Sequence, residues 1–389
     1  MKRILILGGG ELGQGLARAF AQKDCHVVVA DRYQGAPAMR YAHASHVVDL
    51  ADYAAVSELI AHVQPQYMAV EIEGVNMAAV KDAYRSGVNI IPSMHALETA
   101  MEREQLRRLA AEELGLPTTE YAFAETPAQL AEAAERLGYP CLVKAMVSSS
   151  GHGMARVDNA GDVPQAWAQA VKGLIIEKQK VMIEKEVDID YELTVLCVRH
   201  KDGITLCQPI RHQQINGNFV TSCQPADIPE SVLAKANAIA TTIAEALGGF
   251  GVYGVELFVK GDDVLFNEVS PRPHDTAMVT LATQGAYNQF ELCVRAALSM
   301  PIPDNIESRP GASRAIVAKG YGTEIKLAGI DEAEAIYGVR VHTFIKPSVA
   351  GQRRIGLVTA VADSVGEAQM LADEAYSRLS VSVSESVEA

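Results

Sequence analysis

Cysteine is scarce in this 389-residue sequence and follows no metal-binding or disulfide pattern. No two cysteines are separated by two residues, so a zinc site of the CxxC kind is not indicated. Scattered single cysteines also argue against a disulfide framework and fit a reducing compartment. We therefore predict a cytoplasmic protein, whose six cysteines are Cys25, Cys141, Cys197, Cys207, Cys223 and Cys293.

Long apolar runs and an excess of positive charge are also lacking. Nowhere do about 18 apolar residues follow one another, which is the minimum for a transmembrane helix. The formal net charge is -14, so nucleic acids and anionic membrane surfaces would be repelled on average. We therefore predict no nucleic-acid partner and no membrane partner. Any phosphate site must be assembled locally from a few cations.

The first hundred residues are predicted to form a βαβ unit. Short β-branched runs at residues 3–7, 26–30, 46–50, 67–72 and 88–91 alternate with amphipathic stretches. This order is typical of buried parallel strands connected by helices. Ser93 is then expected to cap one long helix that continues to Leu114, before Gly115 and Pro117.

The rest of the chain lacks regular βαβ alternation and is predicted to be α+β. Strands are expected at 140–146, 181–184, 193–198 and 252–259, and helices at 127–137, 163–172 and 231–247. Residues 300–304 are interpreted as a linker to a small β-rich unit, with strands at 315–317, 339–344 and 355–360 and a helix at 365–379. The polar tail 380–389 is expected to fray. The predicted domains are 1–101, 102–310 and 311–389.

A glycine-rich turn follows the first predicted strand. Gly8, Gly10 and Gly13 form a GxGxxG pattern, and Asp31 ends the next strand. The pattern is typical of dinucleotide sites and would make the protein an NAD-dependent oxidoreductase. Alternatively, the glycines only permit a tight turn whose free N–H groups meet a different ligand. Glu11 lies inside the turn, where its carboxylate would crowd a pyrophosphate, and this favours the second interpretation.

A lysine and a small-residue loop form a second motif. Lys144 lies in an apolar run and is followed by a Ser/Gly-rich segment at 148–153. Backbone N–H groups of such a loop can bind phosphate oxygens while a strand-borne lysine neutralises their charge. Ser/Gly segments are more often surface turns. The apolar surroundings of Lys144 favour a functional interpretation, because an unpaired buried ammonium is costly.

Two glutamates on successive predicted strands suggest a metal site. Glu256 and Glu268 flank a turn at 261–263 and lie among apolar residues. Carboxylates on paired strands can bind Mg²⁺ that bridges nucleotide phosphates. The alternative is a pair of solvated strand carboxylates, which the apolar neighbours disfavour.

Two groups of cations complete the motifs. Arg272 is held between Pro271 and Pro273, so that its planar guanidinium suits an oxyanion near the metal. A structural salt bridge is the alternative interpretation. Lys346, Arg353 and Arg354 could bind a phosphate monoester, although alone they would be interpreted as a solvated basic turn.

In this order the motifs resemble those of ATP-grasp enzymes, and specifically the family of formate-dependent phosphoribosylglycinamide formyltransferases. The resemblance extends over nearly the whole chain. Its matching segments are GELG (10–13), DRYxxAPAM (31–39), EIE (71–73), RRLAAEELxLPT (107–118), GYPCxVK (138–144), SSSG (148–151), GVELFV (254–259) and EVSPRPHDTxMVTL (268–281). It implies an α/β and α+β fold with an N-terminal βαβ (preATP-grasp, Rossmann-like) domain, a central ATP-grasp domain and a small C-terminal β-rich domain.

The resemblance also implies a set of site residues. ATP would be bound by Arg103, Lys144, Ser149, Ser150, Gly151, His152, Gly153, Met154, Glu184, Lys185, Glu186, Val187 and Glu192. Mg²⁺ would be bound by Glu256 and Glu268. The acceptor, glycinamide ribonucleotide, would contact Glu11, Leu12, Glu71, Asp275, Lys346, Arg353 and Arg354. Lys144, Arg272 and Asp275 would be catalytic.

The implied activity belongs to purine biosynthesis. Formate would attack the γ-phosphate of ATP to give formyl phosphate and ADP, and the acceptor amine would then take the formyl group. The family also implies a homodimer. His152, Arg211 and Cys223 depart from the family pattern, which leaves open a related ATP-grasp ligase or carboxylase with another carboxylate or phosphorylated amine. A nucleotide-binding protein without turnover is a further alternative.

Overall fold

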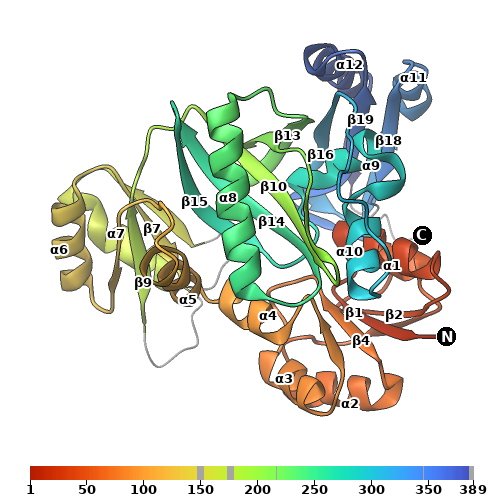
Figure 1. Ribbon diagram of the computed structural model, residues 1–389, viewed down its shortest axis with the longest axis horizontal. Coiled ribbons are helices and arrows are strands. Elements are labelled where there is room, and N and C mark those ends of the chain that lie inside the picture. The colour runs from red at the N-terminus through yellow and green to blue at the C-terminus, as the bar shows by residue number, and fades with distance from the viewer. Residues whose placement is uncertain (147–152, 173–178, 216, 345, 385–389) are drawn as a thin grey trace.

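The computed structural model describes residues 1–146, 153–172, 179–215, 217–344 and 346–384 (Figure 1). Its N-terminal part is a parallel sheet in the order β3-β2-β1-β4-β5. The elements are β1 (Arg3–Leu7), α1 (Glu11–Ala21), β2 (His26–Asp31), the 3-10 helix η1 (Pro37–Tyr41), β3 (Ala44–Val47), α2 (Tyr53–Val63), β4 (Tyr67–Val70), α3 (Met77–Arg85) and β5 (Asn89–Ile91). The predicted βαβ unit is therefore confirmed.

Burial on both faces explains why these strands read as continuous apolar runs. Ile4 and Ile6 belong to a core that includes residues of α1, whereas Leu5 and Leu7 belong to a core with α2 and α3. Such strands must be apolar at every position. The third strand begins two residues earlier and ends three residues earlier than the predicted 46–50, although Leu50 is still buried.

The long helix predicted after Ser93 is broken. The hydroxyl of Ser93 does cap it, accepting from the N–H of Ala96 at 3.0 Å. At Glu102, however, the backbone is extended, with φ -109° and ψ 106°. The segment becomes α4 (Met94–Met101), α5 (Arg103–Arg108) and the π-helix η2 (Leu109–Glu113). The break brings the N–H of Arg103 to 3.4 Å from the carbonyl oxygen of Met146.

A four-stranded antiparallel sheet follows, in the order β6-β9-β7-β8. Its elements are β6 (Tyr121–Ala124), α6 (Pro127–Leu137), β7 (Cys141–Ala145), β8 (Met154–Val157), the 3-10 helix η3 (Ala160–Asp162), α7 (Val163–Val171) and β9 (Val181–Lys185). Residues of α6 and α7 share one core with the strands, and Figure 1 places this unit at one end of the molecule. The α6 helix has the bounds predicted from the sequence.

The largest sheet is antiparallel and has nine strands, in the order β15-β14-β10-β12-β13-β16-β19-β18, with β11 paired to β10. The strands are β10 (Tyr191–His200), β11 (Gly203–Leu206), β12 (Ile210–Ile215), β13 (Asn218–Gln224), β14 (Gly251–Lys260), β15 (Asp263–Ser270), β16 (Gly311–Gly322), β18 (Val339–Thr343) and β19 (Val349–Val361). The long helix α8 (Glu230–Leu247) packs against β10, β14 and β15 (Figure 1). The helix α10 (Gln289–Ala297) also packs on β10 and β14, and it contacts α1.

The C-terminal residues extend this sheet. β13 pairs with β16, so strands from the predicted small β-rich unit continue the sheet of the central part of the chain. The remaining elements are the 3-10 helix η4 (Thr276–Val279), α9 (Thr280–Thr283), the 3-10 helix η5 (Gly285–Tyr287), β17 (Glu324–Ala328), α11 (Ile330–Glu334), α12 (Val365–Ser377) and β20 (Ser380–Ser384). Among the described residues, no helix has the length and apolar character that crossing a membrane requires.

The prediction that the tail frays is wrong for residues 380–384. They form β20, which pairs with β17 in an antiparallel two-stranded sheet. Val381 and Val383 alternate with serines and pack against the core of the C-terminal part. The period-two pattern of a half-buried strand was therefore present in this polar segment.

The turn between β1 and α1 supplies a test of the fold. A Cβ at Gly13 would lie 2.3 Å from the carbonyl oxygen of Gly8. We expect Gly13→Ala to lower the free energy of unfolding by about 2 kcal/mol or more, because the backbone must move. The measurement is urea denaturation. Gly366→Ala is the control, since it lies in α12 with no atom within 4 Å of its Cβ and should be neutral or slightly stabilising.

Candidate active site

A cleft lies between the N-terminal part, the four-stranded sheet and the nine-stranded sheet. Six of its lining residues are charged: Glu73, Arg103, Arg107, Lys144, Glu268 and Arg272. Glu73 comes from the N-terminal part, Lys144 from β7, and Glu268 from β15. The cleft thus brings together four predicted site residues, Arg103, Lys144, Glu268 and Arg272. Two further lining residues, Glu73 and Arg107, had not been predicted as site residues.

A buried carboxylate organises the cations on one wall of this cleft. Glu184, on β9, is 1 % exposed and forms an ion pair with Lys144. It also accepts from Arg107 at 3.1 Å and from the hydroxyl of Thr119 at 3.1 Å. Burial alone would raise the pKa of Glu184, but Lys144 and Arg107 bring it below its ordinary value. Both cations are thereby held in place without a ligand.

The other residues predicted to bind ATP differ in whether their side chains lie beside Lys144. The guanidinium of Arg103 donates to the carbonyl oxygen of Ala145, beside Lys144. Met154 is the cross-strand neighbour of Lys144. The side chain of Lys185 instead donates to the carbonyl oxygen of Gly138 at 2.8 Å. Ser149, Ser150, Gly151 and His152 lie outside the described residues, whereas Gly153 and Val187 are described and half-buried.

Glu186 is bound away from the cleft. Its carboxylate accepts from Nε of Arg156 at 2.6 Å, in a half-exposed ion pair. Together with the hydrogen bonds of Lys185, this contact engages the charged ends of both side chains with other protein groups.

The two predicted metal ligands are direct neighbours. Glu256 on β14 pairs in register with Glu268 on β15. Glu192, on β10, lies on the same face, because Thr194 two residues later is the cross-strand neighbour of Glu256. Burial first, and then the charge of Glu256, raises the pKa of Glu192 to about 7. Three carboxylates therefore share one face of the sheet, where Glu256 raises the pKa of His274 against the effect of burial and so favours its cationic form.

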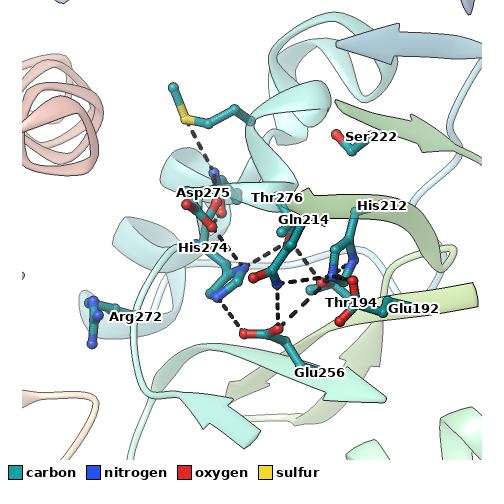
Figure 2. Close-up of polar contacts among 12 residues, drawn as sticks. Glu192, Thr194, His212, Gln214, Ser222, Glu256, Arg272, His274, Asp275 and Thr276 are labelled. Atoms are coloured by element: carbon teal, nitrogen blue, oxygen red, sulfur yellow. Dashed lines mark hydrogen bonds and ion pairs between the residues drawn. The ribbon is translucent and has the colours of Figure 1, made fainter. Parts of the chain in front are cut away.

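Glu256 belongs to a closed ring of hydrogen bonds (Figure 2). Its oxygens contact Nε2 of His274 at 3.1 Å and Nε2 of Gln214 at 2.9 Å. The ring continues through two threonine hydroxyls that lie 2.7 Å apart. Its members are Glu256, His274, Thr276, Thr194, His212 and Gln214. Burial lowers the pKa of His212 to about 4, so this ring member is neutral near pH 7.

A second charged cluster joins all three parts of the chain. Glu11, the first residue of α1, accepts from Lys346 at 2.8 Å and from Arg354 at 3.0 Å. Arg354 also contacts Asp275 at 2.8 Å. Burial would raise the pKa of Glu11, but Arg354 and Lys346 lower it to about 2. Arg354 likewise holds the pKa of Asp275 well below its ordinary range against the effect of burial.

The remaining predicted acceptor residues lie around this cluster. The guanidinium of Arg353 donates to the hydroxyl of Tyr33 at 3.1 Å. Glu71 follows β4 and is buried, and its N–H donates to the carbonyl oxygen of Leu7 at 2.8 Å. The side chain of Leu12 is part of the apolar core, so only its backbone can face a ligand.

Three buried polar atoms in this region have no hydrogen-bond partner among the described residues. They are Oε2 of Glu71, Nε of Arg272 and Nη1 of Arg354. Arg272 does form an ion pair with Glu73 through Nη2. Buried polar atoms are almost always paired in folded proteins, so these three mark directions in which ligand atoms are expected.

Each irregularity in the nine-stranded sheet lies beside a site residue. The register shifts between Glu256 and Leu257, which leaves Asn267 unpaired next to Glu268. A second shift leaves Ile355 unpaired next to Arg354. A third lies at Gln214, in the ring around Glu256. Bulges of this kind redirect side chains, and they are frequent next to active sites.

The dinucleotide interpretation of the glycine-rich turn is not supported. The carboxylate of Asp31 accepts from the N–H of Gly9 at 2.6 Å and from the N–H of Arg32 at 2.7 Å. It is therefore engaged within its own turn rather than available to a ribose. Glu11 and Glu71 add two further carboxyl groups at the place where a pyrophosphate would lie.

Two departures from the family pattern face away from the charged clusters. Arg211 precedes His212 on β12, so its side chain points to the opposite face of the sheet. It stacks over the ring of Tyr191, with 4.5 Å to the centroid. Cys223, its cross-strand neighbour, is buried in the C-terminal core. Arg211 and Cys223 thus lie on the opposite face of the sheet from His212 and Glu256.

Three family models match the chain in order. Residues 1–101 match the ribonucleotide synthetase preATP-grasp domain, residues 109–290 the ATP-grasp domain, and residues 311–379 the PurT C-terminal domain. The predicted fold class is confirmed.

Sequence relatives agree with this order. A formate-dependent phosphoribosylglycinamide formyltransferase from Methylococcus capsulatus is 44% identical over 384 residues, covering 97% of this chain and 95% of its own. One from Nitratidesulfovibrio vulgaris is 43% identical over 379 residues, covering 97% and 96%. The chain belongs to the family of formate-dependent phosphoribosylglycinamide formyltransferases.

Solved structures from two groups of enzymes are similar to this chain. Glycinamide-RNase-transformylase T from Mycobacterium tuberculosis is 30% identical, with a TM-score of 0.80 and coverage of 97% of this chain and 100% of that one. N5-carboxyaminoimidazole ribonucleotide synthetase from Thermotoga maritima is 27% identical, with a TM-score of 0.84 and coverage of 99% and 100%. The backbone is thus shared by both groups. The C-terminal match and the higher sequence identities distinguish the formyltransferase family.

The Glu184 network predicts unequal effects of two neighbouring substitutions. Glu184→Ala leaves Lys144 and Arg107 buried without a counter-ion, and we expect a loss of about 3–5 kcal/mol in the free energy of unfolding. Glu186→Ala removes a half-exposed pair and should cost less than about 1 kcal/mol. Chemical denaturation of both variants measures the difference. Equal losses would contradict the role given to Glu184.

Glu71 predicts a pH dependence of stability. Burial first, and then Glu11, raises its pKa from 4.5 to about 8 in the folded protein. Its contribution to stability is therefore complete below pH 4.5 and is lost as the pH rises through about 8. Between these pH values we expect the free energy of unfolding of Glu71→Gln to fall by a few kcal/mol less than that of the wild type, since one pKa unit corresponds to about 1.4 kcal/mol. Urea denaturation of wild type and variant at about pH 5 and about pH 8.5 measures it.

Proposed function

We propose that this protein uses ATP to transfer formate to the amine of glycinamide ribonucleotide through formyl phosphate. One observation supports this most: the carboxylate and cation cluster of Glu11, Asp275, Lys346 and Arg354 lies next to a cleft that contains Lys144, Glu268 and Arg272. One group offers ligands for a phosphorylated amine and the other for a nucleotide. Their closeness suits transfer of an acyl group between the two.

The nucleotide would lie in the cleft between the four-stranded and nine-stranded sheets. Lys144 and Arg103 are held at its wall by Glu184 and by the carbonyl oxygen of Ala145. Preorganised cations stabilise the charge that spreads over a transferring phosphoryl group. Lys185, Glu186 and Val187 would contact the nucleotide through their backbone.

The carboxylates on β14 and β15 fit Mg²⁺. Glu256 and Glu268 offer oxygen ligands from adjacent strands, and the raised pKa of Glu192 reflects burial and a neighbouring negative charge that a cation would offset. The described residues contain no group of three acidic or histidine side chains placed to hold a metal alone. Bound Mg²⁺ would neutralise phosphate charge, with nucleotide oxygens and waters as its further ligands.

The acceptor would bind in the cluster around Glu11. Lys346, Arg353 and Arg354 carry the charge that a phosphate monoester requires, and Nη1 of Arg354 has no partner in the described protein. Glu11 and Asp275 stay ionised near pH 7 and can orient the amine. Their ion pairs would have to be shared with the incoming phosphate.

The first chemical step forms the acyl phosphate. A formate oxygen would attack the γ-phosphorus, so that one P–O bond forms and the bond to the β-phosphate oxygen breaks, giving ADP. Arg272 faces this cleft with an unpartnered Nε and would hold the carboxylate or the transferring phosphoryl group. Lys144 would neutralise charge on the γ-phosphate.

The alternative is a related ATP-grasp ligase or carboxylase. Its support is the close fold similarity to the N5-carboxyaminoimidazole ribonucleotide synthetase named above. The domain boundaries 1–101, 102–310 and 311–389, the homodimer and the cytoplasmic location also remain proposals.

Isotope transfer tests the proposed function. With ¹⁸O-labelled formate, ATP and glycinamide ribonucleotide, we expect label in inorganic phosphate, because the attacking formate oxygen leaves with the phosphoryl group. Mass spectrometry of the phosphate measures it. Unlabelled phosphate would reject the formyl phosphate route, and ADP release that depends on bicarbonate but not on formate would favour the alternative.

A further inference from the structure

The three carboxyl groups near the acceptor site differ in how they are neutralised. Glu11 contacts Lys346 at 2.8 Å and Arg354 at 3.0 Å, and Asp275 contacts Arg354 at 2.8 Å. Glu71 is also buried, but its Oε2 has no hydrogen-bond partner among the described residues. Two of the three are therefore fixed as paired anions, whereas the third has a buried oxygen that accepts no hydrogen bond from the described residues.

The surroundings of Glu71 are mostly acidic. Glu11 from α1, Asp31 from the end of β2 and Glu73 from its own loop all face it with negative charge. The opposing charge comes from Arg272, which is itself paired with Glu73. Burial, followed by these neighbouring charges, raises the pKa of Glu71 to about 8. The tyrosine hydroxyl of Tyr33 also lies within this electrostatic environment.

The glycine-rich turn is shaped around this carboxyl group. Gly8 has φ +111°, and a Cβ there would lie 2.5 Å from Oε2 of Glu71. A Cβ at Gly10 would lie 3.5 Å from Oε1. A side chain at Gly8 would collide with Oε2 of Glu71, whereas one at Gly10 would only make an ordinary contact with Oε1, so Gly8 keeps the space beside this carboxyl group.

We propose that Glu71 is the general base that takes the proton from the acceptor amine during acyl transfer. This assignment rests on the proposed function. The amine nitrogen forms a bond to the formyl carbon, and the bond from that carbon to the phosphate oxygen breaks with its electron pair leaving on phosphate. The N–H proton passes to Oε2 of Glu71. Release of this proton to solvent restores the carboxylate.

Basicity distinguishes Glu71 from the other two carboxylates. Glu11 has a pKa of about 2 and Asp275 has a pKa well below its ordinary range, because both are held by cations against the effect of burial. Groups this weakly basic hold protons poorly near neutral pH, whereas a base works best when its pKa is close to the working pH. Carboxyl groups whose surroundings separate their pKa values commonly divide acid–base roles in this way.

The experiment separates the two half-reactions in Glu71→Gln. Positional isotope exchange in ATP labelled at the β,γ-bridge, with formate and no acceptor, reports reversible formation of the acyl phosphate. We expect this exchange to remain at the wild-type rate in Glu71→Gln, which also shows that the variant is folded. Transfer to glycinamide ribonucleotide at saturation should fall by about 10²–10⁴-fold. Glu71→Asp should recover part of it.

The pH profile supplies a second measurement. Both Glu71 and the amine must lose a proton, so log(kcat/KM) for the acceptor should rise with a slope near two below about pH 7.5, and near one in Glu71→Gln. Glu11→Gln is the matched control. It removes a paired carboxylate of the same cluster and should mainly raise the acceptor KM while keeping the steeper slope.

Each contrary result has a separate meaning. A Glu71→Gln variant with a higher acceptor KM, unchanged kcat and an unchanged slope would show that Glu71 only binds the acceptor, and would overturn the assignment. Loss of isotope exchange in that variant alone would place Glu71 in the first half-reaction and would also overturn it. Absence of formate-dependent exchange in the wild type would instead reject the proposed function itself.

Discussion

The carboxylate of Glu11 is the group on which the arrangement of the charged cluster of Glu11, Asp275, Lys346 and Arg354 depends. It belongs to the first turn of α1, yet its two ion-pair partners, Lys346 and Arg354, come from the other end of the chain. Arg354 extends the contact to Asp275. Removing these charges from water is costly unless each one has a partner. The cluster can therefore form only when the N-terminal, central and C-terminal parts are all in place.

The same constraint explains the rest of the site. Glu184 holds Lys144 and Arg107 at the cleft wall, and Glu73 holds Arg272. In the proposed function some of these cations bind anionic ligands, and without a ligand protein carboxylates neutralise them. A chain with a net charge of -14 can build a site for phosphates in this way, because the positive charge is concentrated where the domains meet. The atoms left without partners then indicate where the ligands complete the network.

Much of the fold follows from patterns that local chemistry determines. The parallel strands were predicted from apolar runs, and α6 from its proline start and amphipathic period. Several predicted site residues were also brought together, including Lys144 with Glu184 and Glu256 with Glu268. Their proximity follows from the cost of burying such residue types unpaired, and their roles stay predictions.

Other features depend on contacts that are distant in sequence. The break at Glu102 accompanies contacts of Arg103 with the end of β7, and the extension of the nine-stranded sheet arises from the pairing of β13 with β16. Arg107 and Tyr33 lay within family motifs, but only the fold shows that they contact Glu184 and Arg353. Lys185 and Glu186 were predicted to contact ATP, whereas the fold shows that their side chains bind other protein groups.

The site depends on the unpaired residues beside Glu268 and Arg354, so the number of residues in these two strands matters as well as their identity. On a regular strand neighbouring side chains alternate between faces, and the extra residue Ile355 interrupts that alternation directly after Arg354. In β15 the extra residue Asn267 plays the same part beside Glu268, and its carbonyl oxygen accepts from Arg107. Evolution can therefore exchange side chains along these strands more freely than it can insert or delete a residue. Sequence divergence in this family should leave the spacing of these segments intact while the surface loops vary in length.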